Sequence, residues 1–156
     1  MAETQPETET YILCELAGAT YGIPSQLVRQ IEMVEQITPV PNAPPTVVGV
    51  VFSRGLVIPA IDLRLRFGFA QAPYTLRSRL IVVAVGERTV GLIVDTAREF
   101  VKIAADAIQP PPEGISGMSG AYLKGIARIG ERLVVLLGLD EVLLGAEIAA
   151  PVPTEH

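Results

Sequence analysis

The chain has 156 residues, of which 49% are hydrophobic, and its formal net charge is −5. This length suits one domain with a sizeable core, and the hydrophobic content predicts a folded chain. The negative charge argues against nucleic acid as the main partner. One cysteine, Cys14, excludes an internal disulfide, and a single histidine leaves too few side chains for a Cys/His metal site.

Location is constrained by hydropathy and by the first residues. No apolar run reaches about 18 residues, so we expect no membrane insertion. The acidic, polar residues 1–10 are unlike a secretory signal and are predicted to be a disordered tail. A cytoplasmic location is therefore the default expectation.

The predicted elements are mainly short strands, because the apolar residues are mostly Val, Ile, Leu and Ala. The expected strands are residues 11–16, 20–23, 36–40, 47–52, 56–61, 79–85, 89–94, 98–103, 122–129 and 132–137. Short helices are expected over Gln26 to about Glu32, over residues 62–66, and over Leu139 to about Ile148. Residues 104–121 are predicted to be an irregular loop, and residues 149–156 a tail.

The stretch from Gly49 to Phe67 is predicted to organise the fold. Its two apolar runs flank Ser53, Arg54 and Gly55, which predicts a hairpin with a charged tip. Neither run alternates with polar residues, so we expect both faces to be covered and the hairpin to lie in the middle of the core. A tight turn has no need of arginine, which makes Arg54 a candidate for recognising a protein partner; the alternative is a solvated charge.

The two halves of the chain show a weak internal repeat. Gly22 matches Gly91 and Arg29 matches Arg98 at an offset of 69, and Gly49 lies 76 residues before Gly125. This spacing predicts a duplication in which each half forms a barrel-like unit of about five strands. The crevice between the two units would be a natural binding site.

Other residues raise competing interpretations. Leu92–Ala97 contains Asp95 and resembles the D-T-G/A motif of retroviral-type aspartic proteases, which need two carboxylates sharing a proton. The alternative is that Asp95 ends a strand and accepts hydrogen bonds from a turn, and the internal repeat favours this alternative. Cys14 is predicted to be a small buried hydrophobe, and Arg64 and Arg66 to lie on the solvated side of a short helix.

A set of short motifs recurs in the same order in one known family. The motifs include Gly22-Ile23-Pro24, Val28-Arg29-Gln30-Ile31, Arg54-Gly55-x-Val57-Ile58-Pro59-x-Ile61-Asp62-Leu63-Arg64 and Val90-Gly91-Leu92-Ile93-Val94-Asp95. Over about residues 11–145, this ordered set resembles the CheW-like proteins, the coupling proteins of bacterial chemotaxis. Three places depart from the residues usual in that family: Phe52-Ser53 stands where Asn-Leu is common, Gln30 where Glu is frequent, and Gly138 where Asp is frequent.

The resemblance implies a mainly β fold of two SH3-like five-stranded barrels packed together, with short helices and a C-terminal helix, in a single domain over residues 11–148. It implies a non-catalytic adaptor without a cofactor, at cytoplasmic arrays of membrane-bound receptors. The implied partners are the cytoplasmic tip of a methyl-accepting chemoreceptor and the regulatory domain of a CheA-type histidine kinase.

Site residues are also implied by the resemblance. The family's receptor-binding groove lies between the barrels, and the matching positions are Val28, Arg54 and Gly55. The kinase contact should be mainly apolar, on a barrel end of the second half, without assignable residues. Two alternatives stay open: a homodimeric aspartic protease that uses Asp95, and a generic SH3-like peptide-binding module.

Overall fold

The computed structural model describes residues 7–112 and 122–144, which form a mainly β structure. The strands are β1 (Thr8–Leu16), β2 (Ala19–Pro24), β3 (Val28–Met33), β4 (Val47–Ser53), β5 (Leu56–Asp62), β6 (Arg79–Val85), β7 (Arg88–Val94), β8 (Thr96–Ala104), β9 (Ile108–Gln109), β10 (Leu123–Ile129) and β11 (Arg132–Leu137). The helices are α1 (Leu63–Arg66) and α3 (Leu139–Leu144), with 3-10 turns η1 (Ser25–Leu27) and η2 (Ala105–Ala107).

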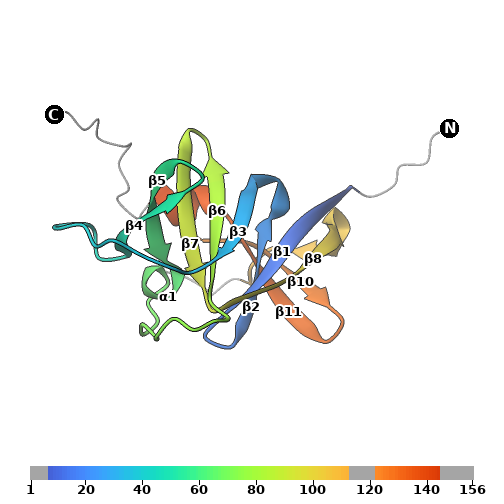
Figure 1. Ribbon diagram of the computed structural model, residues 1–156. Helices are drawn as coiled ribbons and strands as arrows, with labels where there is room; N and C mark the ends of the chain where they lie inside the picture. The colour runs from blue at the N-terminus through green and yellow to red at the C-terminus, as the bar shows by residue number, and fades with distance from the viewer. Residues whose placement is uncertain (1–6, 113–121, 145–156) are drawn as a thin grey trace.

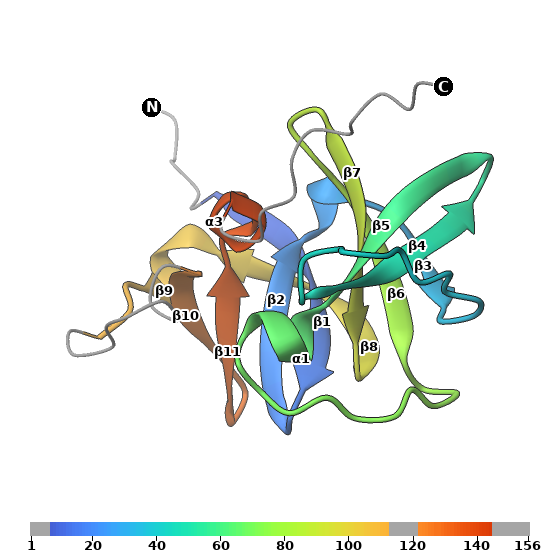
Figure 2. The ribbon, with the colours of Figure 1, turned by 90° about the vertical axis from the view of Figure 1, so that its left-hand side faces the viewer.

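The strands form two curled sheets that lie side by side (Figure 1). Barrel A is the six-stranded sheet β8-β1-β2-β11-β10-β9, and barrel B is the five-stranded sheet β3-β6-β7-β5-β4. Figure 2 shows α1 between the two barrels. The predicted fold of two packed SH3-like barrels is confirmed, with the short strand β9 added to one of them.

The two sheets have matching strand orders, which confirms the predicted internal repeat. The order β8-β1-β2-β11-β10 in barrel A corresponds to β3-β6-β7-β5-β4 in barrel B. The repeated glycines occupy equivalent register positions: Gly49 pairs with Ala60 and Ala60 with Gly91, as Gly125 pairs with Leu136 and Leu136 with Gly22.

The assignment of one half of the chain to each barrel is wrong. Barrel A combines the first hairpin of the chain, β1–β2, with the later strands β8 to β11. Barrel B combines β3 to β5 with the hairpin β6–β7. The two repeats have exchanged their first hairpins, because the chain leaves each hairpin through a short connection, η1 or Asp95, that leads into the other sheet.

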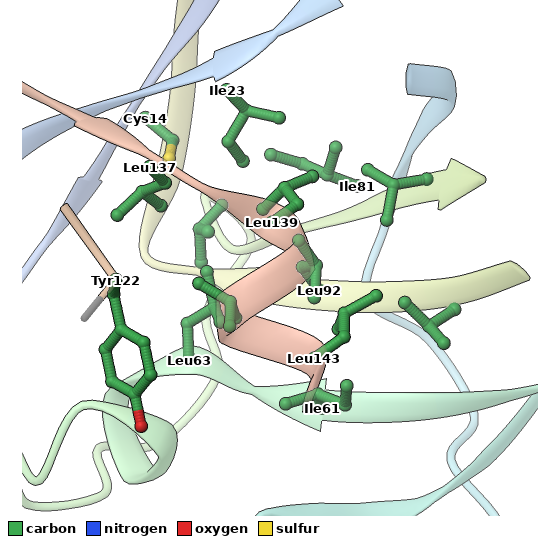
Figure 3. Packing of buried hydrophobic residues seen from close by; sticks show 14 of the residues in the cluster. Cys14, Ile23, Ile61, Leu63, Ile81, Leu92, Tyr122, Leu137, Leu139 and Leu143 are labelled. Atoms are coloured by element: carbon green, nitrogen blue, oxygen red, sulfur yellow. The ribbon is translucent and has the colours of Figure 1, made fainter. Parts of the chain in front are cut away.

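The main hydrophobic cluster lies between the barrels and includes helix α3 (Figure 3). Leu139, Val142 and Leu143 of α3 pack there with residues of both sheets, such as Ile23 and Ile81. Cys14 is fully buried in this cluster, and burial raises the pKa of its thiol to about 12. The prediction that Cys14 is a small hydrophobe is confirmed.

Each barrel also encloses a smaller cluster of its own. Barrel A buries Tyr11, Leu13, Ile103, Ala127, Val134 and Leu136. Barrel B buries Val51, Ile58, Ala60, Leu80, Val82 and Ile93. Many strands contribute residues both to the cluster inside their own barrel and to the cluster between the barrels. Most strands therefore carry apolar residues on both faces.

Barrel B closes at Gly49. The backbones of Thr38 and Val50 exchange two hydrogen bonds of 2.9 Å. The strand predicted over residues 36–40 is reduced to this single β-bridge. A Cβ atom at Gly49 would lie 2.4 Å from the carbonyl oxygen of Thr38. Only glycine fits this approach of one backbone to another.

The predicted helix from Gln26 to about Glu32 is wrong. The chain forms η1 and then β3, and the pairing of β3 with β6 has a β-bulge between Val28 and Gln30. The extra residue in the bulge, Arg29, lets Val28 and Ile31 pack against the same cluster between the barrels. Apolar residues three positions apart on one face are typical of a helix. The bulge gives Val28 and Ile31 this spacing within a strand, which explains the wrong prediction.

The hairpin β4–β5 forms where it was predicted but does not lie in the middle of the core. Strand β4 is at the edge of barrel B, and one face of the hairpin faces solvent. Phe52 is 73% exposed and its cross-strand partner Val57 is 66% exposed. Within the described residues nothing covers these two side chains, so the expectation that both faces are buried is wrong.

The ends of the chain agree in part with the predictions. Strand β1 starts at Thr8, inside the predicted N-terminal tail. Helix α3 runs over Leu139–Leu144, and the rest of the predicted C-terminal helix lies outside the described residues. The same holds for residues 113–121 of the predicted irregular loop.

Candidate partner-binding site at one end of barrel B

The tip of the hairpin β4–β5 is a two-residue turn of Arg54 and Gly55. Ser53 pairs with Leu56, and the φ angles of the two turn residues are +50° and +84°. Positive φ at both positions is the signature of a type I′ turn, which favours Asn and Gly. A left-handed arginine costs about 1–2 kcal/mol, so the turn itself does not explain Arg54.

Arg54 lines a pocket with a volume of about 250 Å³, here called the Arg54 pocket. Its lining residues are Arg29, Gln30, Ser53, Arg54, Leu56, Ile58, Val82 and Thr89. Ile58 and Val82 are buried members of the cluster inside barrel B and form an apolar floor. The pocket is therefore an opening at one end of barrel B with charged residues beside an apolar base.

Three polar side chains join the two edges of barrel B beside this pocket. Ser53 Oγ donates a hydrogen bond of 2.6 Å to Glu32 Oε2. Gln30 Nε2 donates to Ser53 Oγ and to Glu32 Oε2. Since Gln30 and Glu32 belong to β3 and Ser53 to β4, this network holds the edge strands together and fixes the base of the hairpin tip.

Arg29 was not among the site residues predicted from sequence. It lies in the bulge of β3, between the pairs Val28–Val83 and Gln30–Val82, and its side chain is exposed. The signal that could have identified it is its match to Arg98 in the internal repeat, because the pairing of β8 with β1 shifts at the equivalent place.

The predicted residues Val28, Arg54 and Gly55 are not all brought into one pocket. Gly55 adjoins Arg54 in the turn, and the place where a Cβ atom would lie on Gly55 is open. Val28 is on the same strand as Arg29, but it packs against the cluster between the barrels and does not line the Arg54 pocket. All residues that line the Arg54 pocket belong to barrel B.

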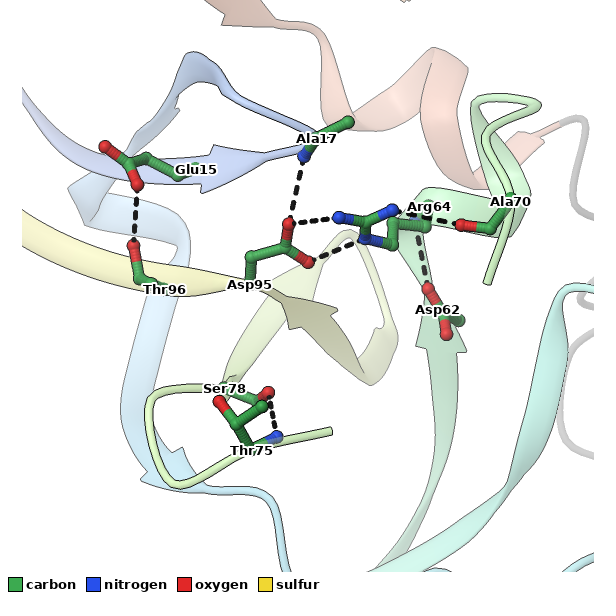
Figure 4. A network of polar contacts seen from close by, with 9 residues as sticks. All are labelled: Glu15, Ala17, Asp62, Arg64, Ala70, Thr75, Ser78, Asp95 and Thr96. Carbon is green, nitrogen blue, oxygen red and sulfur yellow. Dashed lines mark hydrogen bonds and ion pairs between the residues drawn. The ribbon is translucent and has the colours of Figure 1, made fainter. Parts of the chain in front are cut away.

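Asp95 links the two barrels and is not placed for acid–base catalysis (Figure 4). It connects β7 to β8, and its carboxylate accepts hydrogen bonds from Arg64 Nε at 2.9 Å, Arg64 Nη2 at 2.8 Å and the Ala17 backbone N–H at 3.0 Å. The hydrogen bonds from Arg64 hold the pKa of Asp95 below its usual value. A carboxylate in a protease pair must share a proton with a second carboxylate, whereas Arg64 favours the charged form of Asp95, so this geometry supports the turn interpretation over the protease interpretation.

Arg64 and Arg66 were predicted to be solvated, and this prediction is also wrong. Besides the ion pair with Asp95, Arg64 Nη1 donates to the carbonyl of Ala70 at 3.1 Å. Arg66 Nε donates to the carbonyl of Val142 in α3 at 2.9 Å, and its guanidinium lies 4.8 Å from the centre of the Tyr122 ring. The two arginines of α1 therefore fasten barrel B to barrel A and α3.

Residues 7–112 and 122–144 were also searched for membrane-spanning helices and for metal-binding groups. None of their helices is long and apolar enough to span a membrane. They also contain no group of three or more His, Cys, Asp or Glu side chains arranged to hold a metal ion.

These observations define a protein of two pseudo-symmetric SH3-like barrels with an arginine-lined opening at one end. Residues 10–147 match the family profile of the CheW-like domain. The chain is 31% identical over 141 residues to the chemotaxis protein CheW of Klebsiella aerogenes, covering 90% of this chain and 85% of that protein. It is 36% identical over 120 residues to CheW of Rhizobium meliloti, covering 77% of each chain.

A solved structure of a CheW protein also resembles this chain in fold. The scaffolding protein TtCheW from Thermoanaerobacter tengcongensis matches with a TM-score of 0.78 and 29% identity, over 89% of this chain and 90% of that one. The chain belongs to the CheW-like family.

Proposed function

We propose that this chain couples the cytoplasmic tip of a chemoreceptor to the regulatory domain of a CheA-type histidine kinase. The observation that carries the proposal is the match to the CheW-like domain over residues 10–147, nearly the whole chain. The chain is a chemotaxis coupling adaptor of that family. In this role it acts as a non-catalytic scaffold in the cytoplasm, as a single domain over residues 11–148, at arrays of membrane-bound receptors.

For the receptor contact we propose Val28, Arg54 and Gly55. Support comes from the geometry of Arg54, which a closed, two-residue turn presents at the end of a barrel at a cost in backbone strain. Exposed Phe52, Leu56 and Val57 surround the tip with apolar surface. An apolar surface beside a charged side chain suits an amphipathic helix with a polar edge, such as a helical receptor tip.

For the kinase contact we propose a mainly apolar surface on a barrel end. Apolar contacts with few buried charges are typical of stable protein interfaces. A titration of the chain with the regulatory domain of a CheA-type kinase from the same organism tests this contact by calorimetry. Saturable one-to-one binding is expected, and no binding by a folded protein would contradict the proposal.

The receptor contact is tested with Arg54→Ala and a cytoplasmic receptor fragment. We expect weaker binding to the receptor fragment, with the affinity for the kinase domain and the melting temperature unchanged. A parallel loss of stability and of both affinities would show that Arg54 has a structural role instead.

A further inference from the structure

Arg29 and Arg54 line the same pocket although they come from different elements of barrel B. Arg29 lies on the bulge of β3, and Arg54 lies in the turn between β4 and β5. Bulges and left-handed turn residues both change the direction in which a side chain leaves its strand. Two separate backbone irregularities thus direct two arginines to one opening.

Neither arginine has a partner within residues 7–112 and 122–144. No hydrogen bond or ion pair of either side chain occurs there, and both side chains are exposed. Arg64, Arg66 and Arg132, by contrast, each bond to a carboxylate or a carbonyl group. The Arg54 pocket therefore carries two guanidinium groups that are available for an external group.

The surroundings of the pocket favour an anion. The carboxylate of Glu32 on β3 already accepts hydrogen bonds from Ser53 and Gln30. The floor is apolar, from Ile58 and Val82, and Leu56 lines one side. Charge-assisted hydrogen bonds to a carboxylate strengthen when the acceptor is partly removed from water, as an apolar floor would do.

We infer that the Arg54 pocket binds one acidic side chain of the receptor tip, and that Arg29 and Arg54 hold its carboxylate together. Leu56 and the apolar floor contact the aliphatic part of that side chain. This inference rests on the proposed function, since it takes the receptor as the occupant. It adds Arg29 as a residue that determines specificity and names the chemical group that the receptor must supply.

The test measures the affinity of four variants for a cytoplasmic fragment of a chemoreceptor from the same organism. Arg29→Gln and Arg54→Gln are each expected to weaken binding about tenfold, the usual effect of losing a charged hydrogen-bond donor. The double variant is expected to lose less than the product of the two single losses, because one carboxylate is shared. Arg128→Gln is the matched control, since Arg128 is an exposed arginine on β10 of barrel A.

A second arm identifies the acidic group. Each Asp or Glu of the receptor tip is replaced by its amide, and binding is measured with the wild-type chain and with the Arg29→Gln/Arg54→Gln chain. One replacement should weaken wild-type binding about tenfold and leave binding to the double variant unchanged. A receptor fragment with no such replacement would overturn the inference.

The kinase regulatory domain separates the possible failures. If Arg29→Gln binds the receptor fragment as Arg128→Gln does, the inference is overturned while the proposed function stands. If Arg29→Gln lowers the melting temperature and both affinities alike, Arg29 is structural and the inference is again overturned. If the folded wild-type chain binds neither the receptor fragment nor the kinase domain, the proposed function fails, and the inference with it.

Discussion

At the scale of single residues, Arg54 combines an unfavourable backbone with an accessible charge. Its φ of +50° suits asparagine or glycine better than arginine. A residue that costs stability where it stands, and forms no hydrogen bond or ion pair within the described residues, is expected to be kept for binding. Stability and function should then respond to its replacement in opposite directions.

We predict that Arg54→Asn raises the free energy of unfolding by about 0.5–1 kcal/mol, because asparagine tolerates the left-handed region. The same variant should bind the receptor fragment more weakly. Urea denaturation and calorimetry measure the two effects. Gly55→Ala is the comparison: with φ of +84° it should lower the free energy of unfolding by about 1–2 kcal/mol. Loss of stability in Arg54→Asn would contradict this account of the turn.

A second residue-scale prediction concerns pH and Asp95. Since Arg64 lowers the pKa of Asp95 in the folded state, the ion pair adds stability above the unfolded pKa of about 4 and loses it as the pH falls through the folded value. Asp95→Asn should therefore cost about 1–2 kcal/mol at pH 7, and the difference from the wild type should shrink below about pH 4. Denaturation of both chains across pH 3–8 measures it, and a difference that stays constant over this range would contradict the prediction.

At the scale of elements, the edges of barrel B are held together by close contacts that restrict residue type. Gly49 lies against the backbone of Thr38, and Ser53 bonds to Gln30 and Glu32. Ser53 and Gln30 are two of the positions where the chain departs from the usual CheW-like residues, and they contact one another. The two departures therefore act as one change, in which a serine and a glutamine form the hydrogen bonds that close the barrel beside the hairpin tip.

We predict that Gly49→Ala lowers the free energy of unfolding by about 3 kcal/mol or more, because its Cβ would clash with a backbone atom that cannot move alone. Gly18→Ala is the matched control. Its φ is +85° but no atom lies within 4 Å of the added Cβ, so only the backbone strain of about 1–2 kcal/mol is expected. Equal losses in the two variants, measured by urea denaturation, would show that the contact with Thr38 is unimportant.

The comparison of sequence with structure shows which interactions leave a local signal. Gly22, Gly49 and Gly91 could be matched in the sequence because close packing at repeated positions demands glycine. The strand at Val28–Met33 was mistaken for a helix because its bulge gives apolar residues a helical spacing. The ion pair of Arg64 with Asp95 joins residues 31 positions apart and leaves no pattern in the chain. Arg54 could be predicted as a site residue because arginine is unusual in a tight turn. Arg29 was missed because its strand was predicted to be a helix.

At the scale of the whole molecule, the exchange of hairpins makes the two halves of the chain interdependent. Barrel B needs β6–β7 from the second half, and barrel A needs β1–β2 from the first. Neither half contains a complete sheet, and the largest cluster takes residues from both. The chain therefore folds as one unit although it contains two barrels.

We predict that a chain divided between residues 70 and 71 gives two fragments that do not fold separately. Each fragment should show no cooperative thermal transition by circular dichroism, because each keeps only the central hairpin of one sheet and only the flanking strands of the other. Mixing the fragments should restore the transition and the binding of the kinase domain. A cooperative transition in either fragment alone would contradict the exchange of hairpins.

The exchange also has a mechanical consequence. The chain passes from barrel A to barrel B at η1 and returns at Asp95, so two connections cross the boundary instead of one. A single connection would allow one barrel to swivel about the other, whereas two connections, with the guanidinium of Arg64 braced against Asp95, resist torsion. We therefore expect a force applied at the Arg54 tip to move the two barrels together as one rigid body.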